Sequence, residues 1–265
     1  MIKKYLIINK EFKVGGKIVA GFFFVIVGFS SIFFFTGALI LRISTQFFDP
    51  KLRILHLYTC FWASVYIWMM KCWKYKVKGK HNVKRGRTYV VVSNHQSQLD
   101  ILVAFTCFFH FKWVSKIEVF SLPLIGWNMR LNKYIKLKRG DKKSIAEMMD
   151  EAEKTLKSGS SVFIFPEGTR SETGILRPFK PGAFILAKKL KLPVLPIAIN
   201  GTIHALPKYS INYQGVHNMV MEILKPVEYE VFKDMEVEEF ADYVRNMIAK
   251  RVSAHNAGGY LNEKL

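Results

Sequence analysis

Two long apolar runs near the beginning of the chain stand apart from the rest of its hydrophobic pattern. Residues 18–41 contain no charged side chain, and a helix of about 24 apolar residues is long enough to cross the ~30 Å hydrocarbon core of a bilayer. Residues 54–70 form a second run of about 17 residues, which is at the lower limit for spanning. We therefore expect residues 1–72 to form an N-terminal two-helix membrane motif.

Beyond residue 72 the pattern changes to short β-branched segments that alternate with amphipathic helical stretches. This alternation predicts an α/β domain over residues 73–265, with a mixed, largely parallel sheet flanked by helices. The predicted strands are 75–77, 89–92, 112–114, 134–137, 162–165, 194–199 and 219–223, and the predicted helices are 100–109, 122–131, 142–157, 182–189 and 237–255.

The distribution of charge supports a membrane partner. The formal net charge is +20, and residues 1–87 hold sixteen Lys and Arg against two acidic residues. Basic and apolar character together favour the surface of an anionic phospholipid membrane, since each cation near the headgroups gains roughly 1 kcal/mol. A chain this basic could also bind nucleic acid, but no recognition module or basic-aromatic groove is visible, so we expect no nucleic-acid partner.

The basic residues also predict an orientation. Lysines precede the first apolar run and follow the second, which predicts that both ends lie on the cytoplasmic side, at the cytoplasmic face of the inner (cell) membrane. The connector, residues 42–53, is itself basic and a poor candidate for translocation. Two arrangements remain open: a hairpin that crosses twice, and a two-helix wedge in the inner leaflet, which we favour.

A first polar motif follows the predicted strand 89–92. It contains His95 and Asp100, and side chains at the carboxyl ends of parallel strands commonly form active sites. A carboxylate that accepts a hydrogen bond from one imidazole nitrogen orients the ring as a general base. Ser97 and Asp100 also have the spacing of a capping box, so Asp100 could serve only as the carboxylate of a helix cap.

A second polar motif, residues 165–171, follows the predicted strand 162–165. Gly168 lies two residues after a proline, and a glycine lets the backbone approach a ligand closely. Arg170 can form a bidentate contact with a phosphate group. By itself, the same pattern is also typical of a tight turn with a solvated arginine.

The two motifs, in this order and about 70 residues apart, resemble those of the glycerolipid acyltransferase family. The similarity is best to 1-acylglycerol-3-phosphate (lysophosphatidic acid) acyltransferases and covers roughly residues 77–199. The family's second block ends in an arginine that corresponds to Arg139, and its fourth block corresponds to residues 194–197. The segment 113–116 is similar to the family segment whose lysine faces the acceptor phosphate, which nominates Lys116.

Two positions depart from the family pattern. The family usually has an acidic residue before the second-block arginine, where this chain has Lys138, and a glycine commonly opens that block, where this chain has Asn132 or Lys133. These changes leave the catalytic pair as in the family. They fall in the second block, which is thought to bind the acceptor, so they bear on the acceptor specificity.

The resemblance implies transfer of a fatty acyl group from a thioester to the sn-2 hydroxyl of lysophosphatidic acid, giving phosphatidic acid in phospholipid biosynthesis. It implies His95 and Asp100 as the catalytic pair, with the Gly168 amide holding the oxyanion. Glu167 would bind the acceptor through its glycerol or support Arg170, and these two roles stay open. The cationic seat for the acceptor phosphate would consist of Lys116, Arg139 and Arg170.

The expected co-substrate is an acyl carrier protein or coenzyme A thioester, with no cofactor. We expect no metal, because the three cysteines lack metal-ligand spacing. A serine lipid hydrolase would need a GxSxG motif and a metal-dependent one would need clustered His ligands, and neither is present in the sequence. A membrane scaffold would leave both polar motifs unexplained. An acyltransferase that uses a different lysolipid acceptor is the main alternative.

Overall fold

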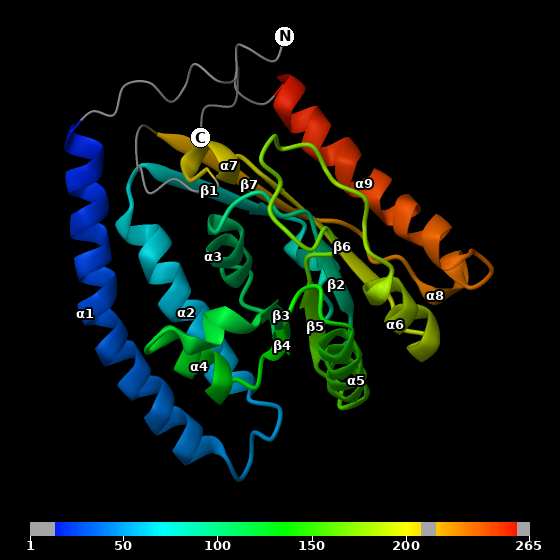
Figure 1. Cartoon of the computed structure of the whole chain (residues 1–265), viewed down its shortest axis with the longest axis horizontal. Coiled ribbons are helices and arrows are strands. Elements are labelled where there is room, and N and C mark those ends of the chain that lie inside the picture. Colours follow the sequence, from blue (N-terminus) through cyan, green and yellow to red (C-terminus); the bar gives the residue numbers. More distant parts are fainter. Residues whose placement is uncertain (1–13, 208–215, 259–265) are drawn as a thin grey trace.

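The computed structural model describes residues 14–207 and 216–258 of the chain. Seven strands and the helices around them make up an α/β architecture (Figure 1). The strands are β1 (Trp73–Lys78), β2 (Val90–Ser93), β3 (Phe111–Lys116), β4 (Ile135–Leu137), β5 (Ser161–Ile164), β6 (Val194–Asn200) and β7 (His217–Ile223). The longer helices are α1 (Val14–Thr45), α2 (Arg53–Met69), α3 (Leu99–Phe105), α4 (Ile125–Leu131), α5 (Lys142–Lys157), α6 (Gly182–Leu190) and α9 (Val237–Gly258).

The sheet is mixed and largely parallel, which confirms the predicted fold class. Its strand order is β1-β7-β6-β2-β5-β3-β4. The five strands from β6 to β4 run parallel, whereas β7 pairs antiparallel with β6 and β1 pairs parallel with β7. The carboxyl ends of β2, β3, β4, β5 and β6 therefore meet at one edge, which we call the carboxyl edge; the opposite side is the amino edge.

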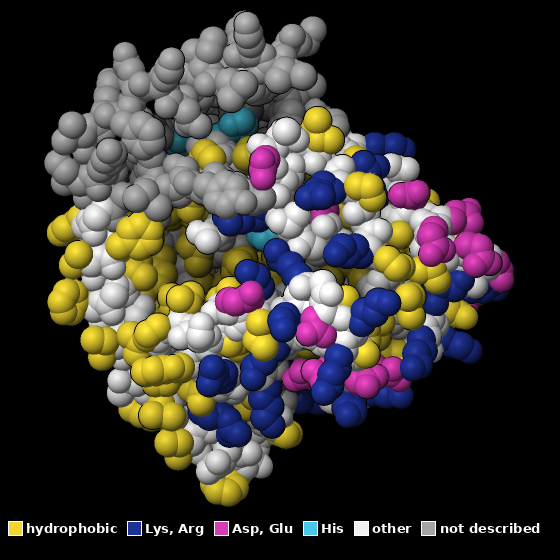
Figure 2. All heavy atoms as spheres, viewed as in Figure 1, with side chains coloured by type: hydrophobic (Ala, Val, Ile, Leu, Met, Phe, Trp, Pro, Cys, Tyr) yellow, Lys and Arg dark blue, Asp and Glu magenta, His cyan; other side chains and the backbone are white. Residues whose placement is uncertain are grey.

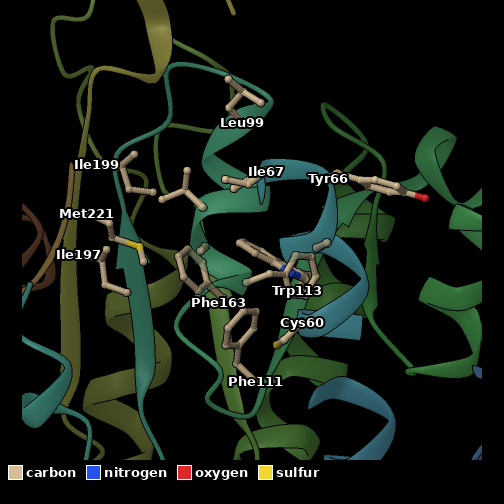
Figure 3. Packing of buried hydrophobic residues seen from close by; sticks show 14 of the residues in the cluster. Cys60, Tyr66, Ile67, Leu99, Phe111, Trp113, Phe163, Ile197, Ile199 and Met221 are labelled. Carbon is tan, nitrogen blue, oxygen red and sulfur yellow. The ribbon is translucent and has the colours of Figure 1, made fainter. Parts of the chain in front are cut away.

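Alternate residues of the buried strands point into two separate cores, one on each face of the sheet. In β2, Val91 packs against α2 and α3, whereas Val90 and Val92 pack against α5, α6 and α9. The first core is rich in aromatic rings from the strands, including Phe111, Trp113 and Phe163, which Figure 3 shows beside α2 residues. Layers on both faces explain why these strands read as continuous apolar segments.

Helix α1 is the outermost element and lies beside α2, which covers most of the space between α1 and the sheet (Figure 1). Among the described residues, it contains the one helical segment long and apolar enough to cross a membrane, Gly21–Thr45, with a mean hydropathy of 2.3. Only 17% of its most apolar window is buried, and Figure 2 shows hydrophobic side chains gathered over this side of the molecule. This helix is compatible with membrane association.

Helix α2 has 17 residues and shares the aromatic core with the sheet. The choice between a hairpin and a wedge, and the boundary at residue 72, stay predictions. The basic segment 3–13, on which the predicted orientation partly depends, lies outside the described residues.

Polar contacts fasten α1 to α2 within otherwise apolar surroundings. The Tyr66 hydroxyl lies 3.1 Å from Oγ of Ser30 and 3.0 Å from Oγ of Ser31, and it accepts a hydrogen bond of 2.7 Å from Nε1 of Trp62. The helices also approach closely at Gly37, where an added Cβ would overlap the Tyr58 hydroxyl. Hydrogen bonds of this kind orient apolar helices, for which hydrophobicity alone gives little specificity.

Several predicted boundaries move by a few residues because of local backbone conformation. The helix predicted over 100–109 ends at Phe105, and Phe108 has a left-handed φ of 53°. The helix predicted over 122–131 begins at residue 125, since Leu124 has a φ of 62°. Just before this helix, residues 117–121 form the short 3-10 helix η4 (Ile117–Ser121). These positive φ values in non-glycine residues are not visible in the hydrophobic pattern.

Candidate active site

His95 lies in the turn that connects β2 to α3, at the carboxyl edge of the sheet. Its Nδ1 is 2.8 Å from Oδ2 of Asp100, whose side chain is fully buried. The carboxylate accepts a hydrogen bond from Nδ1–H, so the neutral imidazole carries its lone pair on Nε2. The His95 side chain keeps 9% exposure. A base in a fixed orientation is therefore present at the carboxyl edge.

Asp100 also stabilises the turn that leads into α3, which begins at Leu99. Its Oδ2 accepts hydrogen bonds from the backbone amides of Gln96 at 2.7 Å and Ser97 at 2.9 Å. Oγ of Ser97 in turn accepts from the Leu99 amide at 3.2 Å. The two alternatives for Asp100 therefore coexist, because one carboxylate both stabilises the turn and orients the imidazole.

Two further residues hold this turn and were missed by the sequence analysis. Thr202, just after β6, donates a hydrogen bond from its hydroxyl to Oδ1 of Asp100. The Asn94 side chain donates to the carbonyl of Ile199 and accepts from its amide, both at 2.8 Å. The polar residues 200–202 at the end of β6 were the sequence signal that could have found Thr202. They end a parallel strand that lies next to β2.

Glu167, directly after β5, ties the second motif to the first. Oε1 accepts a hydrogen bond from the His95 amide at 2.7 Å, and Oε2 accepts from the Arg177 amide at 2.9 Å. The Ser171 amide completes the connection by donating to the His95 carbonyl at 2.8 Å. Burial raises the pKa of Glu167, and the two amides oppose this shift. Both carboxylate oxygens are thus engaged with backbone; the predicted roles toward glycerol or Arg170 stay predictions.

Gly168 forms the turn of the second motif with a left-handed φ of 71°, a conformation that favours glycine. Its amide donates to the Phe165 carbonyl at 3.0 Å, so the predicted oxyanion contact would require this amide to exchange partners. The Lys180 side chain lies against Gly168, with Nζ 3.0 Å from the position of an added Cβ. Lys180 is a cation at this turn that the sequence analysis did not single out.

The topology brings the three predicted phosphate-binding residues to one edge. Lys116 ends β3, Arg139 follows β4 and Arg170 follows β5, and these three strands are neighbours. Burial lowers the pKa of Arg139, and the positive charge of Arg170 adds to this effect. Arg170 also lines a hollow of about 420 Å³ formed by residues 170–177. A concentration of cations at the edge that also carries the imidazole suits an anionic ligand.

Glu118 is the counter-charge within this group. Its carboxylate lies 3.0 Å from Nζ of Lys116, and it raises the pKa of Arg139. Hydrogen bonding with its own backbone and with Lys116 lowers the pKa of Glu118. Both side chains of the Lys116–Glu118 pair are about half-exposed, so a phosphate can displace the carboxylate at little cost.

Aromatic rings from neighbouring strands pack against the imidazole. Phe165 stacks on His95 with centroids 4.0 Å apart and an interplanar angle of 13°, and Trp113 stacks on Phe165 at 5.4 Å. These rings fix the plane of the imidazole. Within residues 14–207 and 216–258, no three His, Cys, Asp or Glu side chains form a group suited to a metal ion; the absence of a cofactor stays a prediction.

Residues 74–200 match the family model described as Acyltransferase. The chain is 30% identical to the 1-acyl-sn-glycerol-3-phosphate acyltransferase of Limnanthes douglasii, over 74% of this chain and 68% of that protein. The chain belongs to the acyltransferase family. This confirms the resemblance drawn from His95, Asp100 and the motif at 165–171.

Other members of the acyltransferase family agree with this assignment. A chloroplastic 1-acyl-sn-glycerol-3-phosphate acyltransferase of Arabidopsis thaliana is 36% identical over 82% of this chain and 61% of its own length. The chain spans about three fifths of the first curated relatives that it matches. The crystal structure of the 1-acyl-sn-glycerophosphate acyltransferase of Thermotoga maritima superposes with a TM-score of 0.75 at 25% identity, covering 92% of this chain and 97% of that one.

Proposed function

We propose that this protein transfers a fatty acyl group from a thioester to the sn-2 hydroxyl of lysophosphatidic acid, giving phosphatidic acid. The observation that carries the proposal is the His95–Asp100 pair, at the same edge of the sheet as Lys116, Arg139 and Arg170. Relatives named for this reaction support it.

The pair suits removal of a proton from an alcohol. Nε2 of His95 takes the proton of the sn-2 hydroxyl as its oxygen attacks the thioester carbonyl, and Asp100 stabilises the imidazolium that forms. The C–O bond forms, the C–S bond breaks, and the imidazolium returns its proton to the departing thiolate. The acceptor's hydroxyl is the nucleophile, so the transfer needs no acyl-enzyme intermediate.

The cations select the acceptor by its phosphate. Lys116, Arg139 and Arg170 come from three neighbouring strand ends and can neutralise a doubly charged phosphate monoester. A zwitterionic lysolipid carries a phosphodiester with one negative charge and a positive group, for which this seat is less suited. We therefore favour lysophosphatidic acid over other lysolipid acceptors, which remain the alternative.

We also propose that catalysis occurs at the cytoplasmic face of the cell membrane. The exposed apolar surface of α1 would bury itself in the bilayer, which brings the acyl chains of both substrates to the carboxyl edge. The donor would be an acyl carrier protein or coenzyme A thioester.

The direct test uses the purified full chain in phosphatidylcholine vesicles. Each lysolipid of a panel (lysophosphatidic acid, lysophosphatidylcholine and lysophosphatidylglycerol) is supplied with an acyl-coenzyme A or an acyl-carrier-protein thioester, and the products are identified by mass spectrometry. We expect phosphatidic acid as the main product and none from the His95→Ala variant. Preferential acylation of another lysolipid would replace the proposed acceptor, and full activity of His95→Ala would refute the mechanism.

A further inference from the structure

A second hollow, of about 400 Å³, opens at the amino edge of the sheet. We call it the amino-edge pocket. Lys112 near the start of β3 and Ser160 just before β5 belong to its wall, so the pocket lies at the opposite ends of the strands that carry the catalytic motifs. The lining residues are Pro50, Lys51, Leu52, Lys112, Lys133, Glu151, Thr155, Ser158 and Ser160.

Three lysines from separate elements converge on this pocket. Lys112 is 5% exposed and donates one hydrogen bond, 2.7 Å long, to the carbonyl of Asn132. Lys51 reaches across from the α1–α2 connector until its Nζ is 2.7 Å from the position of an added Cβ on Gly159. Across residues 14–207 and 216–258, neither Lys51, Lys112 nor Lys133 forms an ion pair within 4.0 Å.

Two acidic residues lie near the three lysines without forming an ion pair with them, and Asp49 acts on Lys112 from a distance. Oδ2 of the buried Asp49 accepts a hydrogen bond from the Ile54 amide at 2.7 Å. Glu151 belongs to the wall, but the cations that influence its pKa are Lys136 and Lys154, which lie outside the pocket. The pocket therefore holds an excess of positive charge.

This excess is costly in the empty protein. Burial lowers the pKa of Lys112 to about 7, and the like charges of Lys133 and Arg42 contribute while Asp49 opposes the shift. Burial also lowers the pKa of neighbouring His110 to about 3, with Lys112 as a further cause. A buried cation that forms no ion pair is unfavourable, and an anion in the pocket would reduce that penalty.

The pocket also adjoins the exposed apolar surface of the molecule. The connector that supplies Lys51 also contains Phe47 and Phe48, which are 89% and 68% exposed. A headgroup anchored near these rings could enter a cationic hollow at the depth where phosphates lie in a bilayer.

We propose that the amino-edge pocket is a second phosphate-binding site, separate from the catalytic site and independent of the proposed reaction. Three lysines on different elements suit the several oxygens of one phosphate group. The phosphate can belong to an anionic lipid headgroup or be free in solution. A phosphate from either source would link the α1–α2 connector to β3 and to the segment before β5.

The test removes the catalytic cations first, so that one candidate phosphate site remains. The purified full chain carrying Lys116→Ala, Arg139→Ala and Arg170→Ala, in a neutral detergent, is titrated calorimetrically with dihexanoyl phosphatidic acid and, separately, with inorganic phosphate. Lys51→Gln with Lys133→Gln is then added. Lys142→Gln with Lys143→Gln, two exposed lysines of α5, is the control with the same change in net charge.

We expect saturable binding that weakens roughly tenfold or more in the Lys51/Lys133 pair and stays unchanged in the control pair. Inorganic phosphate that binds and competes would identify free phosphate as the ligand; binding of phosphatidic acid without such competition would identify the lipid headgroup. Equal affinity in all variants, or equal loss in both pairs, would overturn the proposal. A Lys112→Met variant, whose fold is verified by circular dichroism, provides a second check and should weaken the same binding.

Discussion

The Thr202 hydroxyl donates a hydrogen bond to Oδ1 of Asp100, while Oδ2 of the same carboxylate accepts a hydrogen bond from Nδ1–H of His95. The end of β6 therefore supports the proposed catalytic pair, although 102 residues separate the threonine from the aspartate. Each oxygen of Asp100 has its own partner, which prevents the carboxylate from rotating away from the imidazole.

Replacing Thr202 with valine should lower kcat roughly tenfold to a hundredfold, since a hydrogen bond to a charged group contributes about 1.5–3 kcal/mol. The substrate KM values should change little, because Thr202 acts through Asp100. Steady-state kinetics and the pH profile of kcat measure the effect. Thr202→Ser keeps the hydroxyl and should retain most of the activity; equal rates for the two variants would exclude this positioning role.

Asp100→Asn should reduce kcat by several orders of magnitude, because an amide does not stabilise the imidazolium and favours the wrong imidazole tautomer. A lost helix cap alone would cost about 1 kcal/mol of stability and little activity. Comparing kcat with the thermal unfolding midpoint separates the two roles. Gln98→Ala, in the same turn but exposed, is the control, and activity of Asp100→Asn within tenfold of the native protein would contradict the proposal.

Arg170→Ala should raise the KM for the acceptor more than the KM for the thioester, by roughly tenfold if one charge-assisted contact to phosphate is lost. Initial rates with each substrate varied in turn provide the measurement. Arg85→Ala, an exposed arginine at the amino edge, should leave both constants unchanged. A larger effect on the thioester would move Arg170 from the acceptor phosphate to the donor.

Gly37→Ala should destabilise the pairing of α1 with α2 by about 1 kcal/mol, because the new methyl group would overlap the Tyr58 hydroxyl. Gly28→Ala is the matched control on the same helix, since an added Cβ there has nothing within 4 Å and alanine favours the helix. Thermal unfolding in detergent measures both. Tyr58→Phe should relieve part of the Gly37→Ala effect; strictly additive changes would show that the two positions do not interact.

The lowered pKa of Lys112 predicts that the free energy of unfolding rises with pH. The unfolded chain binds this proton below an ordinary pKa of 10.5, whereas the folded chain binds it only below about 7, so the folded state gains stability as pH increases through that window. Thermal unfolding in phosphate-free buffer at about pH 7 and about pH 9.5 should show the gain. Lys112→Met should lose this component and the exposed control Lys136→Met should keep it; parallel pH profiles for all three proteins would contradict the assignment.

The sequence predicted the His95–Asp100 pair because both residues lie in one turn, where spacing and capping chemistry limit the geometry. It could not predict the contacts of Asn94 with Ile199 or of Thr202 with Asp100, since those depend on which strands become neighbours. The alternation of strands and helices was sufficient for a largely parallel sheet. The positive φ values at Phe108 and Leu124 leave no mark on the hydrophobic pattern, so the predicted ends of the adjacent helices were displaced.

The stack of Trp113, Phe165 and His95 has a consequence for the timing of each turnover. With Phe165 4.0 Å from one face and Nδ1 hydrogen-bonded to Asp100, the imidazole is held on two sides before any substrate arrives. Each turnover therefore begins with the ring already oriented, and the proton that comes and goes is the one on Nε2.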